Sequence, residues 1–310
     1  ILAKSAFGSL DDFAMTLFYA TPLIFTGLSV AIAFHAGLFN IGAEGQLTFG
    51  ALSAAAVGML FPSVPGPFAP LLGVLAAFCG GAVWGFLPGW LRARRGSHEV
   101  ITTIMLNFVA AGLASWVTLY VLRNTETQNP ETKPIGAEYL LSRLPGAGDA
   151  PLTGALFLAF LCAGLVWVFL WRTPSGFQLR ATGENENAAE TAGIDSARIR
   201  ILAMTLAGGL AGLVGVGEVL GNAGKFRLGF SADFGFTGIA VALLARNSPI
   251  GVVFAAVLFG ALHKGSGDLD FETENVTREL ALIFQALVIL AVVAEGLWDR
   301  ILPKKGGKIG

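Results

Sequence analysis

Residues 35–52 read His-Ala-Gly-Leu-Phe-Asn-Ile-Gly-Ala-Glu-Gly-Gln-Leu-Thr-Phe-Gly-Ala-Leu, and this stretch decides how the rest of the chain is interpreted. Apolar runs precede and follow it, at residues 17–34 and 47–61. Polar side chains lie between the two runs: His35, Asn40, Glu44 and Gln46. Glycines separate these polar side chains: Gly37, Gly42 and Gly45.

Two properties of this stretch predict a break in the helical structure. Polar groups at membrane depth are costly and are tolerated where they face protein or a cavity, and each glycine weakens a regular helix by about a kcal/mol. The stretch therefore predicts a broken or re-entrant segment that lines a polar path. A plain cytoplasmic turn between two spans is the alternative, and composition alone favours it slightly because turns also collect Gly and Asn.

The composition is that of a membrane protein. The 310 residues are 54% hydrophobic and 13% charged, whereas a soluble domain is about 25% charged. The mean hydropathy is +0.69, and the net charge of −1 gives no footprint for nucleic acid. Cys79 and Cys162 lie in apolar runs and predict no disulfide framework. Because the chain begins at Ile1 and not at Met, we expect that an N-terminal piece is missing, either a signal peptide or a first span.

Apolar runs of roughly 20 residues predict membrane-spanning helices. Such runs occupy residues 13–34, 71–91, 100–122, 152–171, 201–220 and 280–298. Shorter apolar runs occupy residues 47–61, 234–245 and 252–262. The predicted fold for residues 1–310 is a single all-α domain, a polytopic transmembrane bundle with broken or re-entrant helices. An inverted repeat would relate residues 37–50 to residues 235–251, since both pair a glycine-rich break with a short apolar run.

The positive charges predict the orientation, because loops rich in Lys and Arg face the cytoplasm. Alternating the spans places most of the 20 Lys and Arg residues on one side, close to the span ends. Residues 172–200 and the C-terminus lie on that side and are expected in the cytoplasm. Residues 123–150 are expected on the extracytoplasmic side.

A second informative motif lies in the stretch expected in the cytoplasm. Asn185 can cap a short helix at residues 186–192, and Gly193 can end it in the left-handed conformation. The small side chains of Ala188 and Ala189 leave a surface that a partner could approach closely. The alternative, and the more common fate of such a segment, is a surface helix exposed to solvent.

Four blocks of sequence carry a resemblance to a known family. They are Gly-Leu-Phe-Asn-Ile-Gly-Ala-Glu-Gly-Gln at residues 37–46, Glu-Val-Ile-Thr-Thr-Ile-Met-Leu-Asn-Phe at 99–108, Ala-Thr-Gly-Glu-Asn-Glu-Asn-Ala-Ala-Glu-Thr-Ala-Gly-Ile at 181–194, and Gly-Phe-Thr-Gly-Ile-Ala-Val-Ala-Leu-Leu-Ala-Arg-Asn-Ser-Pro-Ile-Gly at 235–251. In this order they resemble permease subunits of bacterial ABC importers of the branched-chain amino acid and ribose type, in the nucleoside and simple-sugar branch. The pair Ser97-His98 departs from the residues that the family more often has before Glu99.

The resemblance implies a permease subunit that forms the translocation path for nucleosides or related sugar-containing solutes. Branched-chain amino acids and simple sugars are the alternative cargoes. It also implies a location in the bacterial inner membrane and three partners: a cytoplasmic ABC ATPase, a second homologous permease and an extracytoplasmic substrate-binding lipoprotein. The sequence has no Gly-x-x-x-x-Gly-Lys-[Ser/Thr] phosphate loop. We therefore expect ATP on the ATPase subunit and no cofactor on this chain.

The candidate site residues follow from these patterns and the resemblance. We expect the translocation path at Phe39, Asn40, Glu44, Gln46, Asn107 and Glu218. We expect the contact with the ATPase at Glu186, Asn187, Ala188, Ala189 and Gly193. Asn107 could bond a sugar hydroxyl, although an interhelical hydrogen bond is commoner.

Several alternatives stay open. The phenylalanines at positions 226, 230, 234 and 236 could stack a base, although aromatic residues at that depth more often anchor a span at the interface. An ion-coupled secondary transporter would use the same broken helices and could couple through Glu44 and Glu218. An enzyme is not expected, because His35, His98 and His263 are scattered and lack metal-ligand spacing.

Overall fold

The computed structural model describes residues 2–231 and 233–272, together with positions 283, 286, 287 and 290. Helices form the regular structure of this part of the chain, and isolated β-bridges lie in its loops. The predicted span at residues 280–298 falls almost entirely outside the described residues.

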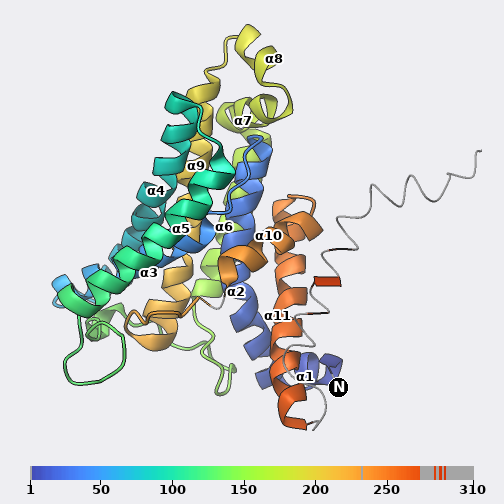
Figure 1. The fold of residues 1–310 in the computed structure, drawn as a ribbon. Coiled ribbons are helices and arrows are strands. Elements are labelled where there is room, and N and C mark those ends of the chain that lie inside the picture. The colour runs from blue at the N-terminus through green and yellow to red at the C-terminus, as the bar shows by residue number, and fades with distance from the viewer. Residues whose placement is uncertain (1, 232, 273–282, 284–285, 288–289, 291–310) are drawn as a thin grey trace, which may run out of the picture.

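Six helices of the described residues are long and apolar enough to cross a membrane. They are α2 (Leu10–His35), α4 (Ala69–Arg95), α5 (Glu99–Trp116) continued by the π-helix η1 (Val117–Val121), α6 (Ala155–Arg172), α9 (Ser196–Gly212) continued by the π-helix η3 (Val216–Ala223), and the part Pro249–Gly267 of α11 (Pro249–Glu272). The remaining helices are α1 (Leu2–Phe7), α3 (Ala43–Leu60), the short η2 (Ala137–Tyr139), α7 (Pro174–Glu184), α8 (Glu186–Thr191) and α10 (Phe234–Leu244). The predicted polytopic bundle is confirmed (Figure 1), while the inverted repeat stays a prediction.

One predicted boundary is wrong. The sequence suggested a short apolar run at residues 252–262, but α11 continues to Glu272 and is long enough to span. Polar residues at the end of the run hid this continuation, and each has a partner on α2. The ring of His263 packs 4.4 Å from the ring of Tyr19, and the Lys264 ammonium pairs with Asp12 at 3.4 Å.

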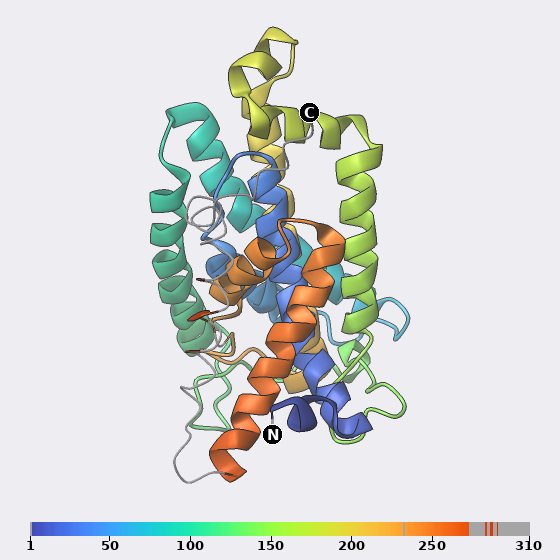
Figure 2. The ribbon, with the colours of Figure 1, turned by 90° about the vertical axis from the view of Figure 1, so that its right-hand side faces the viewer.

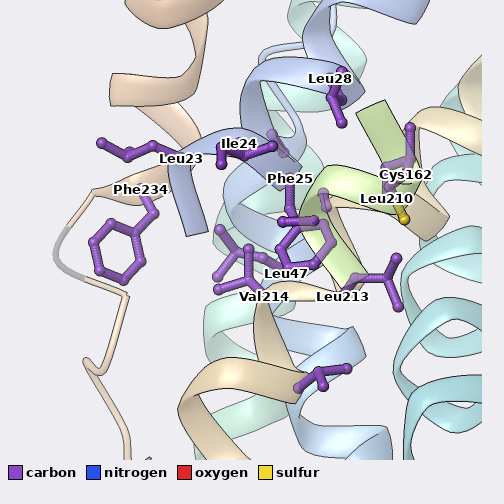
Figure 3. Packing of buried hydrophobic residues seen from close by; sticks show 14 of the residues in the cluster. Leu23, Ile24, Phe25, Leu28, Leu47, Cys162, Leu210, Leu213, Val214 and Phe234 are labelled. Atoms are coloured by element: carbon purple, nitrogen blue, oxygen red, sulfur yellow. The ribbon is translucent and has the colours of Figure 1, made fainter. Parts of the chain in front are cut away.

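Helix α2 is the centre of the bundle. Within its most apolar window 78% of the residues are buried, and α6, α9, α10 and α11 all pack against it (Figures 1 and 2). Figure 3 shows Phe25 of α2 grouped with Leu47 of α3 and with Leu213 and Val214, which lie between α9 and η3. The apolar run that leads into the opening stretch is therefore the core of the fold.

The opening stretch is broken, as predicted, and is not a plain exposed turn. Helix α2 ends at His35, residues 38–40 have no regular structure, and α3 begins at Ala43. Ala36, Leu38 and Asn40 are each at most 1% exposed, so this segment passes through the protein interior. The start of α3 lies against the start of α10, where Gly235 approaches the Glu44 backbone too closely to accept a side chain. Two helix beginnings thus meet inside the bundle.

Glycines let α4 and α9 approach at backbone distance. A Cβ added at Gly208 would collide with the carbonyl oxygen of Gly81, and one added at Gly212 would collide with that of Ala77. Helices in a membrane associate largely through such close van der Waals packing. These contacts form an α4–α9 seam, defined here by Ala77, Gly81, Gly208 and Gly212.

The two long polar segments lie at opposite ends of the bundle (Figure 1). Helices α7 and α8 are at one end, and residues 123–153 are at the other. In the latter segment Glu131 is 2% exposed, receives a hydrogen bond from the Lys225 ammonium at 2.7 Å, and lies 3.5 Å from Arg227. The Lys225 hydrogen bond lowers the pKa of the Glu131 carboxyl below its usual 4.5. This cluster attaches the loop to the connection between η3 and α10.

Candidate translocation site and coupling surface

Glu44 joins the two helix beginnings. It lies in the first turn of α3, and its Oε2 accepts a hydrogen bond from the backbone N–H of Gly235 at 2.8 Å. The Ser231 hydroxyl donates to Oε1 of the same carboxylate. Gly235 lies in the first turn of α10, where backbone N–H groups lack helical partners and favour negative charge. Glu44 therefore caps α10 from another helix.

Asn107 of α5 supports the same junction from the other side. Its Oδ1 accepts from the backbone N–H of Gly45 at 2.9 Å, and its Nδ2 donates to the carbonyl oxygen of Ile41 at 2.9 Å. One carboxamide thus satisfies backbone groups on both sides of the break. This bond between elements is the commoner of the two roles weighed for Asn107.

Asn40 and Gln46 are placed differently from the expectation that they line a path. They are 0% and 1% exposed, and their side-chain amides bond each other at 2.8 and 3.1 Å. Asn40 also donates to the Ser29 hydroxyl at 3.2 Å and accepts from the Gly42 N–H at 3.1 Å. Buried amides need hydrogen-bond partners, and Asn40 and Gln46 find theirs in each other, in Ser29 and in the Gly42 backbone. These bonds hold the broken segment in its conformation.

A cavity of about 190 Å³ lies beside the junction, and we call it the polar cavity because Glu44 and Asn107 line it. Its walls come from the start of α3, from one face of α5 and from the loop before α10. The residues that line it are Glu44, Thr48, Asn107, Ala111, Ala114, Ser115, Phe226, Leu228, Gly229, Phe230 and Ser231. The structure thus brings Glu44 and Asn107 together with two of the phenylalanines that the sequence singled out.

The other expected path residues lie elsewhere. The Phe39 ring packs against Phe34 at 5.1 Å. Glu218 is in η3, where it accepts a hydrogen bond from the Asn222 amide at 3.3 Å. It lines a separate small pocket between η3 and α2, together with Phe18 and Pro22. Neither residue lies in the wall of the polar cavity.

The opposite end of the bundle carries the expected coupling helix, α8. The Asn185 side chain caps it by accepting from the Ala188 N–H at 3.0 Å, and Gly193 has φ of 83°. Its exposed residues include Asn187 and Ala188. Ala189 is 4% exposed, whereas Ala188 and Ala192 are exposed small residues that line the groove at this corner.

Two sets of contacts attach this corner to the membrane-spanning helices. The two terminal guanidinium nitrogens of Arg200, in α9, donate to the Glu186 carboxylate of α8, at 2.5 Å from Nη1 to Oε1 and 2.8 Å from Nη2 to Oε2. Arg180 of α7 donates through Nε to the carbonyl oxygen of Leu170 in α6 at 3.1 Å. A displacement of α8 would therefore act directly on α9 and, through α7, on α6.

The corner also forms a groove of about 420 Å³. Its lining residues are Phe177, Arg180, Ala181, Glu184, Asn185, Ala188, Ala189, Ala192 and Ile194. Phe177 is 60% exposed in this otherwise polar region. Sequence reasoning missed Phe177 and Arg200 here, and Ser231 and Thr48 at the cavity. A lone aromatic residue in the polar stretch was the available signal for Phe177, whereas the other three depend on contacts between distant segments.

Comparison with known proteins adds two findings. The family model described as "Branched-chain amino acid transport system / permease component" matches residues 13–293. The nucleoside ABC transporter permease protein NupB of Lactococcus lactis subsp. cremoris is 35% identical over 97% of this chain and 84% of its own. The guanosine ABC transporter permease protein NupP of Bacillus subtilis is 38% identical over 94% and 84%. The glucose ABC transporter permease protein TsgB13 of Haloferax volcanii is 36% identical over 94% and 78%.

Proposed function

The chain belongs to the family of permease components of branched-chain amino acid transport systems, so it is a multi-pass ABC transporter permease and not an enzyme, and we propose that it carries nucleosides or related sugar-containing solutes. The single observation that supports this cargo most is the polar cavity beside the α3–α10 junction. It combines a carboxylate, an amide and hydroxyl groups with two phenylalanine rings. Such a set suits a solute that has both hydroxyl groups and a planar ring.

The translocation path runs past this cavity in the proposal. Glu44 and Asn107 line it, while Asn40 and Gln46 hold the broken segment in shape. Irregular backbone at membrane depth is tolerated where protein buries it or where it lines a cavity, and discontinuous helices commonly build the binding sites of transporters. Glu218 and Phe39 would affect transport through helix packing.

The proposed partner at the α7–α8 end is a cytoplasmic ATPase subunit, which binds the ATP. A ligand can move a protein only through contacts that differ between two states. Helix α8 offers such a contact because its ion pair to Arg200 and the Arg180 bond of α7 connect it to α9 and α6. This chain then needs no cofactor of its own.

Two further partners complete the proposed importer in the bacterial inner membrane. Helix α5 leaves most of its surface uncovered, since only 17% of its apolar window is buried, and its exposed apolar residues include Met105 and Phe108. A second homologous permease would cover this face, which adjoins the polar cavity. A substrate-binding lipoprotein would dock at the opposite end from α8, on the segment that Glu131 secures.

Affinity purification from the native membrane tests this assembly. A tagged chain should bring down an ATPase subunit and a second permease, and nucleoside should stimulate ATP hydrolysis when the binding protein is added. Isolation of the chain alone from membranes that transport nucleosides normally would contradict the assembly.

A further inference from the structure

The polar cavity has an aromatic wall and a polar wall. Phe226 and Phe230 form the aromatic wall, with their ring centroids 5.5 Å apart and their planes at 68°. Glu44, Asn107 and Ser115 face them from α3 and α5. Rings in an edge-to-face pair do not stack face on face, so the pair itself leaves ring faces uncovered for a further partner. The cavity therefore offers stacking on one side and hydrogen bonding on the other.

We propose that this cavity recognises a planar heteroaromatic ring, and that Phe230 is the stacking residue that makes the permease select solutes carrying such a ring. The inference rests on the proposed function and goes beyond it, because it assigns selectivity to the permease itself in addition to any binding protein. Base–aromatic stacking suits a transport site because it favours every planar base.

The two phenylalanines have different surroundings, which assign them different roles. Phe226 is 1% exposed, and its backbone N–H and carbonyl oxygen both bond Thr132, at 3.0 Å each. It is thereby fixed and acts as the support. Phe230 is half-buried and follows Gly229, whose φ of 74° turns the chain at this point. Phe230 is therefore the ring with a face open to a ligand.

The polar wall can receive the edge of a stacked ring. Each Glu44 oxygen already accepts one hydrogen bond, from Ser231 or from Gly235, and a carboxylate has about four acceptor positions. A ring N–H of the solute could donate to one of the acceptor positions of Glu44 that remain. For the Ser115 hydroxyl, no bond to another described residue is present, so it can donate to a ring nitrogen or carbonyl oxygen.

The size of the cavity limits what it holds. About 190 Å³ is below the roughly 300–1,000 Å³ of sites that enclose a drug-sized ligand. The cavity can therefore enclose one ring system while the rest of the solute extends out of it. A simple sugar would find the hydrogen-bonding groups and could pack its C–H face on the ring, but it has no π-face of its own. It would therefore gain less from Phe230 than a planar base does, which gives the basis for discrimination.

The test compares Phe230→Leu with Phe230→Tyr in the complete complex. Leucine keeps an apolar side chain but removes the stacking face, whereas tyrosine keeps that face. Phe236→Leu is the matched control, because Phe236 is 45% exposed and does not line the cavity. Initial rates of nucleoside uptake would be measured in proteoliposomes with saturating binding protein, after each complex is shown to retain its ATPase subunit and thermal stability.

We expect Phe230→Leu to lower the maximal nucleoside rate by on the order of tenfold, with Phe230→Tyr and Phe236→Leu near wild type. The concentration for half-maximal uptake, which the binding protein sets, should change little. Equal rates for Phe230→Leu and wild type would overturn the inference and leave the proposed function intact, as would an equal loss in Phe230→Leu and Phe230→Tyr. If the wild-type complex imports no nucleoside, the proposed function fails, and that result is visible before any variant is compared.

Discussion

Glu44 connects the beginnings of α3 and α10 through a single carboxylate. Its replacement should therefore lower both the stability of the protein and its rate of transport. Glu44→Ala leaves the Gly235 N–H without its partner, and an unsatisfied buried donor costs about 1–3 kcal/mol. We predict a lower melting temperature of the purified complex and impaired uptake, with the partners still bound. Glu44→Gln keeps an acceptor oxygen and should show a smaller loss.

Glu190→Ala is the control for this prediction, because Glu190 is an exposed carboxylate on α8 that lines neither the cavity nor the groove. It should match wild type in both assays. If Glu44→Ala also matched wild type in melting temperature and uptake, the capping role would be refuted.

Residue types at membrane depth could be predicted from the sequence, but their partners could not. Asn40, Glu44 and Gln46 all signal a broken segment, because a polar group there needs protein or a cavity. Whether such a polar side chain faces protein or a cavity depends on its contacts with residues that are distant in the sequence. Glu44 meets Ser231 and lines the cavity, whereas Asn40 and Gln46 satisfy each other.

At the scale of elements, the α4–α9 seam depends on glycine. In Gly208→Leu the new side chain would meet the backbone of Gly81 and Gly85. Overpacking costs typically about 1–3 kcal/mol, and backbone cannot move aside as a side chain can. We therefore predict that Gly208→Leu prevents recovery of folded protein, as measured by monodisperse elution in detergent.

Gly164→Leu on α6 is the matched control, since nothing lies within 4 Å of a Cβ added at Gly164. This variant should elute like wild type. Normal elution of Gly208→Leu would show that α4 and α9 do not pack at backbone distance.

The coupling helix gives a second prediction at this scale. Ala188 is exposed in the groove of the α7–α8 corner, so Ala188→Trp should clash with an ATPase subunit without disturbing α8 itself. We expect uptake to fall at least tenfold while the binding protein keeps its affinity for solute. Uptake and solute-stimulated ATP hydrolysis would be measured on the same preparation.

Glu190→Trp provides the control, because Glu190 is exposed on α8 but does not line the groove. It adds the same bulk away from the proposed contact and should transport normally. Wild-type activity in Ala188→Trp would contradict docking in the groove. Ala189, which the sequence also offered for this contact, is buried in the corner, so its substitution would report on folding.

The boundaries of elements were predictable where apolar runs were continuous and failed where polar residues interrupt a helix. Helices α4 and α5 begin within two residues of their predicted first positions, 71 and 100. Helix α11 extends beyond its predicted end because His263 and Lys264 find partners on α2. These partners come from a helix that is distant in the sequence, so the local sequence pattern around His263 and Lys264 could not predict them.

For the whole molecule, the orientation in the membrane gives the next prediction. The structure separates α7 and α8 from residues 123–153 at opposite ends, and the Lys and Arg distribution places α7 and α8 in the cytoplasm. In a variant without Cys79 and Cys162, a cysteine introduced by Gln178→Cys should resist a membrane-impermeant thiol reagent in cells whose periplasm the reagent reaches. A cysteine introduced by Glu126→Cys should react, and the reverse pattern would invert the topology.

The central claim is that ATP hydrolysis on a partner drives transport through this chain. The most direct measurement is nucleoside accumulation in proteoliposomes that hold the purified complex, with ATP supplied to the ATPase face and the binding protein to the other. The account predicts accumulation that requires ATP and the ATPase subunit, and that persists when ionophores remove the proton and sodium gradients. Accumulation by this chain without the ATPase subunit, driven by an ion gradient and abolished by ionophores, would contradict it.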